Sequence, residues 1–406
     1  MNNRTSFSLI ANLFLLLFLG VVDNQMISPL LPLIQKSFGV DVTTVGALVV
    51  AYSIAAACSA LLSGALSDHY GRKAFLVSAA IGFAVFSLLT HWAYSFAVLL
   101  VLRFLVGLCA GTISTCTIAL ASDTFPYEIR GRAIGTISSA YFAALILGVP
   151  IGSLAADRFE WRTIFPALAL VALLIAVTNA IFLPPRKIQA KAADSDLLRT
   201  RLKSFMRFFS KSDLLASVVM AFFVSGGIVG LITYIGVWLN TAYQIPIRWV
   251  GIIFLLSGVV SLVGAPLGGV LSDRWGKRRV SMISCVLLAV AILLIPMLHW
   301  GVALFAVFGL VSLGAAFRQG PITALITELV DEKERGAFVA LRNISSQLGI
   351  ASAAFLGGIL YQTWGYTAVA ILCSGFTLVV VWLLAQFIQE PHLEHHSVVS
   401  GPVGSR

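Results

Sequence analysis

Charged residues are scarce in this chain of 406 residues. Lys, Arg, Asp and Glu together make up 11% of it, whereas 59% of the residues are hydrophobic. A soluble protein of this length needs far more charge to cover its surface. The mean hydropathy is +0.97, and the apolar residues fall in blocks of about 20 or more, the length that crosses a bilayer as a helix. We therefore predict an all-α integral membrane protein.

The motifs of several enzyme classes are also missing. No G-x-x-x-x-G-K-[ST] loop is present, which argues against ATP-driven transport by this chain, and neither H-E-x-x-H nor G-x-S-x-G occurs. The five cysteines lie inside apolar blocks and form no CxxC pair. We expect no enzyme activity, no metal site and no cofactor.

The positive charge is unevenly distributed along the chain. Lys and Arg number 27 against 17 Asp and Glu, which gives a net charge of +10. Most of the basic residues fall in the N-terminal segment, the even-numbered loops and the tail, and the odd-numbered loops hold only Lys36, Arg158, Arg162 and Arg248. This pattern predicts that both termini are cytoplasmic, in a bacterial inner (plasma) membrane. The basic balance therefore indicates orientation and not a nucleic-acid partner.

Twelve spans are predicted, at residues 8–35, 43–67, 74–93, 96–124, 133–156, 162–183, 214–239, 248–272, 279–299, 302–329, 337–361 and 365–388. Short loops join them except at the middle of the chain. We predict an N-terminal six-helix bundle at 1–183, a basic cytoplasmic linker at 184–212, a C-terminal six-helix bundle at 213–390 and a cytoplasmic tail at 391–406.

The two halves resemble each other at one constant offset. The loop Gly64-Ala-Leu-Ser-Asp-His-Tyr-Gly-Arg-Lys73 recurs 205 residues later as Gly269-Val-Leu-Ser-Asp-Arg-Trp-Gly-Lys-Arg278. The same offset relates Arg130 to Arg335, and it relates Asp123 to Glu328. A duplication explains this regularity, so we predict two pseudo-symmetric bundles with a substrate path between them.

The loop after span two resembles the signature loop of the major facilitator superfamily, and the second copy stands where that family also carries one. The resemblance covers essentially the whole chain and implies a secondary active transporter that works by alternating access. It also implies a conformational latch on the cytoplasmic side. The latch residues implied for this chain are Gly64, Asp68, Gly71, Arg72 and Asp123 in the first copy, with Asp273, Lys277, Glu328, Arg130 and Arg335 around the second.

The two copies of the latch are unequal. In the family the loop Asp caps the start of span eleven and the loop Arg pairs with an acid ending span four, which Asp68, Arg72 and Asp123 match. Lys277 replaces this arginine in the second copy. Lysine lacks the planar fork that binds a carboxylate through two bonds, so we expect the second network to be looser.

Asp23 and Arg103 are ionisable residues inside predicted spans, where charge is costly and usually functional. At a rise of about 1.5 Å per residue, Asp23 lies about 22 Å from the cytoplasmic end of span one. Arg103 lies about 10 Å from the outer end of span four, which runs the other way. The two residues therefore lie at similar heights, and we expect them to form a proton-coupling charge pair.

Further motifs resemble the drug:proton antiporters of the family. Arg103-Phe-Leu-Val-Gly107-x-x-x-Gly111 is similar to their span-four motif, although many members carry Gln where this chain has Val106. Gly148-Val-Pro150-Ile-Gly152 resembles the span-five signature G-P-x-x-G-G imperfectly. These glycines and the proline also fit a simpler reading as packing and bend positions.

A proton-coupled exporter of a drug-like, lipid-like or metabolite molecule is the function that these resemblances imply. Its partners would be the small-molecule substrate, protons and membrane lipids, with no nucleic acid, and we expect a functional monomer. In one state Arg103 would hold an ionised Asp23, and a proton from outside would neutralise Asp23 and change which state is favoured. The alternative is proton- or ion-coupled uptake or exchange of an organic anion or another nutrient.

Arg318 and Arg342 lie in spans ten and eleven without an obvious acid at their depth. They could bind an anionic substrate group or a lipid phosphate. Alternatively they snorkel to the surface or pair with Asp331, Glu332 or Glu334. The other candidate cavity residues are polar or aromatic side chains in the spans: Asn24, Gln25, Tyr141, Tyr234, Trp238, Gln319 and Asn343.

Overall fold

The computed structural model is helical throughout the residues that it describes, which are 3–183, 205–327, 329–330 and 334–388. Twelve segments in these ranges are long and apolar enough to cross a membrane, as the sequence predicts. A helix satisfies its backbone N–H and C=O groups internally, which a bilayer requires. Most of the predicted linker and the whole predicted tail lie outside the described residues.

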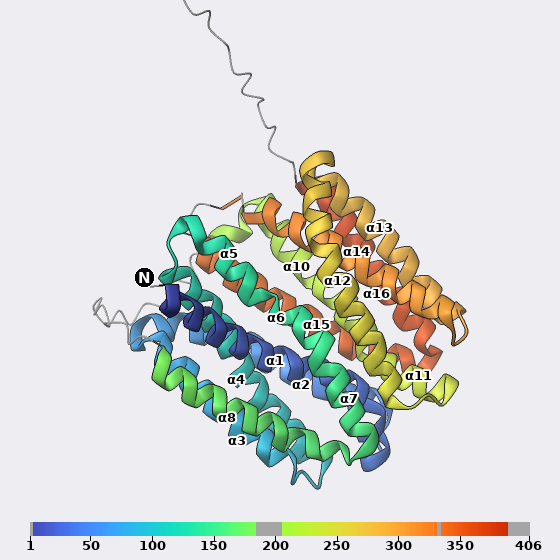
Figure 1. Cartoon of the computed structure of the whole chain (residues 1–406). Coiled ribbons are helices and arrows are strands. Elements are labelled where there is room, and N and C mark those ends of the chain that lie inside the picture. Colours follow the sequence, from blue (N-terminus) through green and yellow to red (C-terminus); the bar gives the residue numbers. More distant parts are fainter. Residues whose placement is uncertain (1–2, 184–204, 328, 331–333, 389–406) are drawn as a thin grey trace, which may run out of the picture.

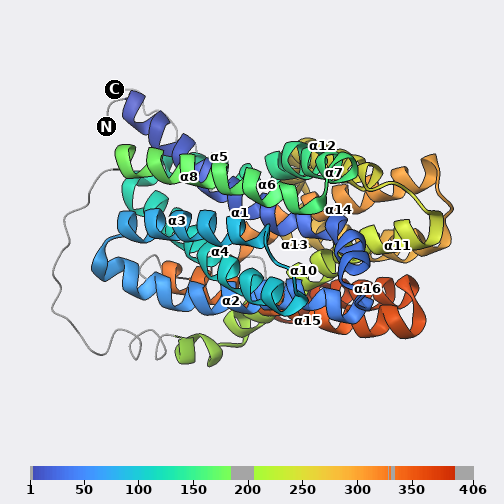
Figure 2. The same ribbon diagram turned by 90° about the horizontal axis from the view of Figure 1, so that it is seen from below.

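The helices form two bundles, which Figures 1 and 2 show side by side in blue to green and in yellow to red. The first comprises α1 (Asn3–Phe38), α2 (Val42–Tyr70), α3 (Arg72–Thr90), α4 (Phe96–Thr124), α5 (Tyr127–Ser138), α6 (Ala140–Ala143), η1 (Ala144–Gly148), α7 (Val149–Arg158), η2 (Trp161–Thr163) and α8 (Ile164–Phe182). The second comprises α10 (Ser212–Thr233), α11 (Ile235–Tyr243), α12 (Ile247–Trp275), α13 (Lys277–Leu294), η3 (Ile295–Met297), α14 (Val302–Thr327), α15 (Arg335–Trp364) and α16 (Tyr366–Phe387). The predicted two-bundle architecture is confirmed.

Two of the spans are interrupted, although the sequence predicts them as continuous. Span five passes from α5 and α6 through one turn of π-helix, η1, into α7. Pro150 explains the turn, because proline has no N–H to donate to the carbonyl four residues earlier. Span seven breaks at Tyr234, whose ψ of 2° leaves the helical range between α10 and α11.

The duplication is visible in how α2 and α12 end. Gly71 has a φ of +93° and Gly276 a φ of +90°. Each donates its N–H to the carbonyl of a serine four residues earlier, Ser67 and Ser272 respectively. Only glycine adopts a positive φ without steric cost, so both copies of the repeated loop turn at the residue that the motif predicts.

Each half has its own apolar core. Leu13, Leu16 and Phe83 are fully buried in the core of the N-terminal half. In the C-terminal half, the ring of Trp238 stacks on that of Tyr366 with centroids 4.6 Å apart. Apolar side chains on the outside remain exposed, as Leu287 does at 64%, because the solvent of this surface is lipid and not water.

The two halves pack against each other along α2 and α15, and their other contacts lie near one end of the molecule. We call the face at which α1 begins and α16 ends the terminal face, and the opposite face the distal face. Near the distal face α1 contacts α11, and α7 contacts α12. Arg248 Nη1 lies 3.3 Å from Asp157 Oδ2, and Thr43 Oγ1 donates to Gln362 Oε1 at 2.6 Å. The distal face is therefore closed by polar contacts between the halves.

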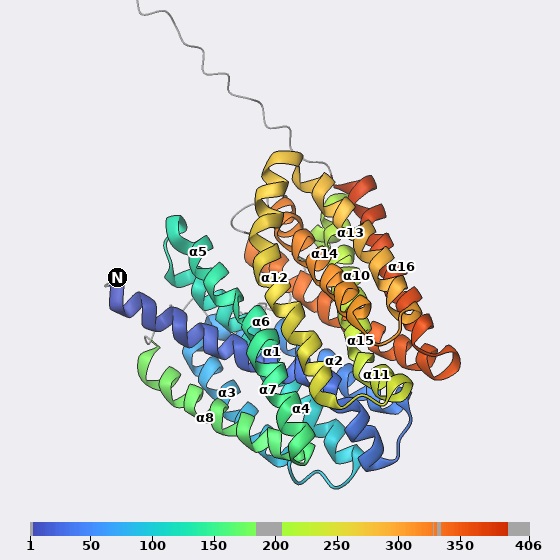
Figure 3. The same ribbon diagram turned by 45° about the vertical axis from the view of Figure 1, so that its right-hand side comes forward.

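Toward the terminal face α5 and α12 diverge, and Figure 3 shows the start of α5 well apart from the end of α12. The contacts of α12 with span five come from its first turns. A Cβ added at Gly251 would lie 2.8 Å from the Cβ of Ser153, and one at Gly258 would lie 2.6 Å from Ile146. On the side of α5 and α12 the two halves thus separate toward the terminal face, whereas α2 and α15 stay in contact.

We predict that Gly107→Ala destabilises the protein. A Cβ at Gly107 would lie 2.4 Å from the backbone oxygen of Tyr52 in α2, and overpacking of this kind costs about 1–3 kcal/mol. The apparent Tm of the purified protein in detergent should fall. The matched control is Gly375→Ala in α16, where nothing lies within 4 Å of an added Cβ. A Gly107→Ala protein as stable as this control would contradict the close contact between α2 and α4.

Candidate functional site

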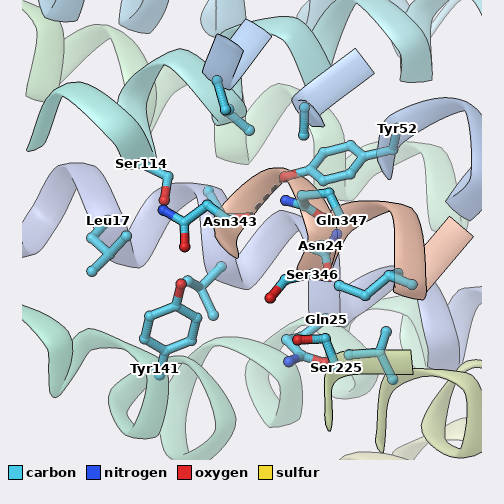
Figure 4. Close-up of a pocket in the computed structure, with 18 of the residues that line it drawn as sticks. Leu17, Asn24, Gln25, Tyr52, Ser114, Tyr141, Ser225, Asn343, Ser346 and Gln347 are labelled. Atoms are coloured by element: carbon cyan, nitrogen blue, oxygen red, sulfur yellow. Dashed lines mark hydrogen bonds between the residues drawn. The ribbon is translucent and has the colours of Figure 1, made fainter. Parts of the chain in front are cut away.

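A cavity of about 400 Å³ lies between the two halves, midway along the helices that surround it. Its wall is formed by α1, α2, α4 and α6 from one half and by α10, α14 and α15 from the other. Figure 4 shows polar side chains that reach into it from both halves. The polar lining residues are Asn24, Gln25, Tyr52, Ser114, Thr115, Tyr141, Ser225, Arg318, Gln319, Asn343, Ser346 and Gln347.

The charge of the cavity wall is positive. Among the described lining residues, Arg318 is the one that carries a charge, and no Asp or Glu is present. The remaining polar groups are amides, hydroxyls and phenols, which donate and accept hydrogen bonds without a net charge. The cavity can therefore hold a small polar solute, and its electrostatics disfavour a cation.

Asp23 and Arg103 form a buried ion pair beside this cavity. Arg103 Nη1 donates to Asp23 Oδ1 at 2.9 Å and to Oδ2 at 3.0 Å. Both residues are 1% exposed. The pair joins α1 to α4, as the depth argument predicts, whereas its role in proton coupling remains a prediction.

Tyr52 of α2 connects the ion pair to the cavity. The centre of its ring lies 4.9 Å from Cζ of Arg103, a cation–π arrangement. Its hydroxyl donates to the carbonyl of Gly20 at 3.3 Å. Because Tyr52 also lines the cavity, a movement of this ring changes the surroundings of the ion pair and of the bound solute together.

Arg318 of α14 has a different environment. The residue is 2% exposed, and its Nη2 donates to the carbonyl of Val224 at 3.0 Å. It neither snorkels to the surface nor pairs with Glu334, which bonds to Arg207 instead at 2.5 Å. The alternative that Arg318 reaches the surface or pairs with Glu334 is therefore wrong. The other two acids of that alternative, Asp331 and Glu332, lie outside the described residues.

Arg342 behaves differently from Arg318. It does not belong to the lining of the cavity, and its Nε is buried without a hydrogen-bond acceptor. The prediction that both arginines form one anion site is therefore not supported by their positions.

The other predicted cavity residues divide into two groups. Asn24, Gln25, Tyr141, Gln319 and Asn343 line the cavity. The prediction is wrong for two aromatic residues at the start of α11, Tyr234 and Trp238, which are 0% and 8% exposed in the apolar core. The Tyr234 hydroxyl donates to the carbonyl of Ala354, and both residues belong to the closed distal end.

Several lining residues were not predicted. Tyr52, Ser114, Ser225 and Ser346 are small or weakly polar residues inside otherwise apolar spans. This signal is weak, because serine and threonine in membrane helices often bond to their own backbone carbonyls. Thr112, one residue from the cavity wall, does this by donating to Leu108 at 3.0 Å.

One ion pair of the predicted latch is present. Arg72 Nη2 lies 3.0 Å from Asp123 Oδ2, joining the start of α3 to the end of α4. Asp41, outside the spans, caps α2 by accepting from the Thr44 N–H at 2.6 Å, and this hydrogen bond lowers the pKa of the Asp41 carboxyl. The side chains of Asp68, Glu328 and Arg335 lie outside the described residues.

In the second latch copy, Asp273 is exposed. Arg130 Nε donates to the carbonyl of Phe125 at 3.2 Å within its own half, and Lys277 begins α13 directly after the turn at Gly276. The latch function of both copies remains a prediction.

The span-four and span-five glycines lie at close helix contacts. Gly107 and Gly111 face the backbone of α2 at Tyr52 and Ala56. In span five, Gly148 lies against Val22 of α1, and Gly152 lies against Met26. These contacts support the packing interpretation of the glycines, and the π-helical turn supports the bend at Pro150.

Two repeated helix bundles around a polar central cavity define a membrane transporter. The chain belongs to the Major Facilitator Superfamily, whose family model matches residues 13–262 and 219–402. It is 26% identical to an uncharacterized MFS-type transporter of Bacillus subtilis (strain 168), over 88% of this chain and 86% of the relative. It is 24% identical to the hexuronate transporter of the same organism, over 96% of each chain.

The fold is also that of a solved sugar transporter. The partially occluded inward open conformation of the xylose transporter XylE from E. coli superposes with a TM-score of 0.76, covering 95% of this chain and 98% of that one at 15% identity. The fold and the relatives are those of transporters and not of enzymes.

We predict that Asp23→Ala destabilises the protein more than Arg103→Met does. The first change leaves a buried guanidinium without its partner, which costs about 3–5 kcal/mol. The second leaves a carboxyl group, which can become neutral by binding a proton, whereas arginine cannot lose its charge. Apparent Tm values of the two variants and of the double variant in detergent measure this difference.

The double variant Asp23→Ala/Arg103→Met should recover most of the loss, because no unpaired charge remains. If Asp23→Ala alone is as stable as the double variant, the two side chains do not stabilise each other in the folded protein.

Proposed function

We propose that this chain moves a small solute across the membrane by alternating access and couples that movement to protons at Asp23. The observation that supports this proposal is the Asp23–Arg103 ion pair, which is fully buried yet joined to the cavity through Tyr52. A buried acid next to a substrate cavity is the usual proton carrier of a transporter. One chain contains the whole cavity, so the transporter is proposed to function as a monomer.

The proposed cycle follows from the charge of the pair. With Asp23 ionised, two charge-assisted hydrogen bonds hold α1 to α4. A proton on Asp23 removes the negative charge, weakens these bonds and releases Arg103 to find another acceptor. Because α1 contacts α11 across the halves, the change alters the relative stability of the two cavity states.

The structure corresponds, in this proposal, to the state that faces the cytoplasm. The halves are closed at the distal face, and α5 and α12 diverge toward the terminal face. The distribution of Lys and Arg supports a terminal face that lies in the cytoplasm of a bacterial cell, with the chain in the plasma (inner) membrane. In the opposite state, the predicted latch would close the terminal face, and the Arg72–Asp123 pair, which joins α3 to α4 within one half, would hold the loop of that latch in position.

Export is the direction that we propose, on the resemblance of Asp23, Arg103 and the span-four glycines to the drug:proton antiporters. One observation favours the second candidate, uptake or exchange of an organic anion. Arg318 gives the cavity a positive charge that no described acid in its lining balances, and the hexuronate transporter is among the relatives.

We predict that Asp23→Asn abolishes transport driven by a pH gradient while solute exchange persists. The amide keeps the size of the carboxylate and one of its two acceptor oxygens but cannot bind and release the proton. The measurement is solute flux in inverted vesicles with an acidic interior, tested with a panel of cationic and anionic compounds. Accumulation of solute would indicate antiport and hence export, whereas release of preloaded solute would indicate symport.

Asp213→Asn is the control, since Asp213 is an acid in the first turn of α10 outside the cavity. Proton-driven flux in Asp23→Asn at the level of this control would rule out Asp23 as the coupling residue.

A further inference from the structure

Arg318 is a buried arginine whose charge is paired with no acid among the residues that the structure describes. Its Nη2 donates to the carbonyl of Val224, and neither Nε nor Nη1 has a hydrogen-bond acceptor. The thiol of Cys285 is the other group beside the guanidinium, and a neutral thiol is a weak acceptor. By contrast, Arg103 at similar burial has a carboxylate. A buried charge without a counter-charge is costly, so this site is incomplete in the absence of a ligand.

Because Arg318 lines the central cavity, a solute in that cavity could supply a hydrogen-bond acceptor for its guanidinium. The residue lines the central cavity on α14, as Gln319 does, and the polar residues Asn343, Ser346 and Gln347 of α15 line the same cavity. Gln347 also has a buried Oε1 without a hydrogen-bond donor. A solute that brings an anionic oxygen to Arg318 and a hydroxyl or N–H donor to Gln347 would satisfy both residues.

The number of charges limits the class of solute. Arg318 is the single charged side chain among the described lining residues, and Arg342 lies outside the lining. One positive charge balances one negative charge. A carboxylate supplies that single charge with two acceptor oxygens, whereas a phosphate monoester carries about 1.5 to 2 negative charges at neutral pH and calls for further basic residues.

We propose that the cavity binds a small organic monocarboxylate, with the carboxylate on Arg318 and the polar remainder of the solute against Asn343 and Gln347. The inference rests on the transport function proposed above, but not on proton coupling. It assigns the two charged sites of the protein to different tasks. The Asp23–Arg103 pair binds the proton, and Arg318 in the other half binds the solute.

The test measures binding to the purified wild-type protein in detergent at fixed pH and ionic strength, by the ligand-dependent rise in Tm. The probes are acids and their neutral amides of nearly the same shape: D-glucuronate and D-glucuronamide, benzoate and benzamide, lactate and lactamide. At least one carboxylate should stabilise the wild-type protein saturably, and its amide should bind at least about tenfold more weakly, since a hydrogen bond to a charged group is worth about 1.5–3 kcal/mol.

Arg318→Gln should abolish the preference for the carboxylate, and Arg158→Gln should leave it unchanged. Arg158 is an exposed arginine at the end of α7, so the control removes the same charge away from the cavity. Arg318→Met provides a readout that needs no ligand. Because it removes a buried charge without a partner, the ligand-free protein should have a higher Tm than wild type.

Three results would overturn the inference: equal stabilisation of Arg318→Gln and wild type by the carboxylates, binding of the amides alone, or no effect of any carboxylate on wild type. A lower Tm for ligand-free Arg318→Met would also count against it. Asp23→Asn separates this inference from the proposed coupling, since that variant should still bind the carboxylate. Carboxylate binding with no proton movement would refute the coupling and sustain the solute site.

Discussion

Inside a membrane, every polar or charged group must find its partner within the protein, because the surrounding lipid offers none. This constraint explains the helical spans, whose backbone groups bond to one another. It also explains why the π-helical turn η1, which follows the cavity residue Tyr141, is covered by α1 and α12 and not exposed to lipid. It also explains the close pairing of Asp23 with Arg103, two charges that are 1% exposed. Arg318 and Gln347 are described cavity residues with buried polar atoms for which the protein supplies no hydrogen-bond partner.

The duplication gives two halves with one fold but different chemistry. Both copies turn at a glycine with positive φ, Gly71 and Gly276. The N-terminal half carries the buried Asp23–Arg103 charge pair beside the cavity. The C-terminal half places Arg318 in the cavity wall, where the described lining residues include no acid.

Much of the fold could be predicted from the sequence because membrane helices follow simple rules. The twelve spans follow from apolar length, and the two bundles follow from the constant offset of 205 residues between the repeated loops. The pairing of Asp23 and Arg103 follows from depth along antiparallel helices. Depth does not give the direction in which a side chain faces. For this reason the sequence predicts Tyr234 and Trp238 in the cavity, whereas in the structure they pack in the core at the distal end.

The sequence by itself determined the spans, the repeat, the glycine turns and the height of each intramembrane charge, since these depend on local composition and the fixed rise of a helix. Only the tertiary structure decided how each helix is rotated about its axis, because rotation depends on packing against neighbours such as Gly107 on Tyr52. Rotation places Arg318 on the cavity wall and leaves Arg342 out of it. It therefore decided which of two similar span arginines is available to a solute.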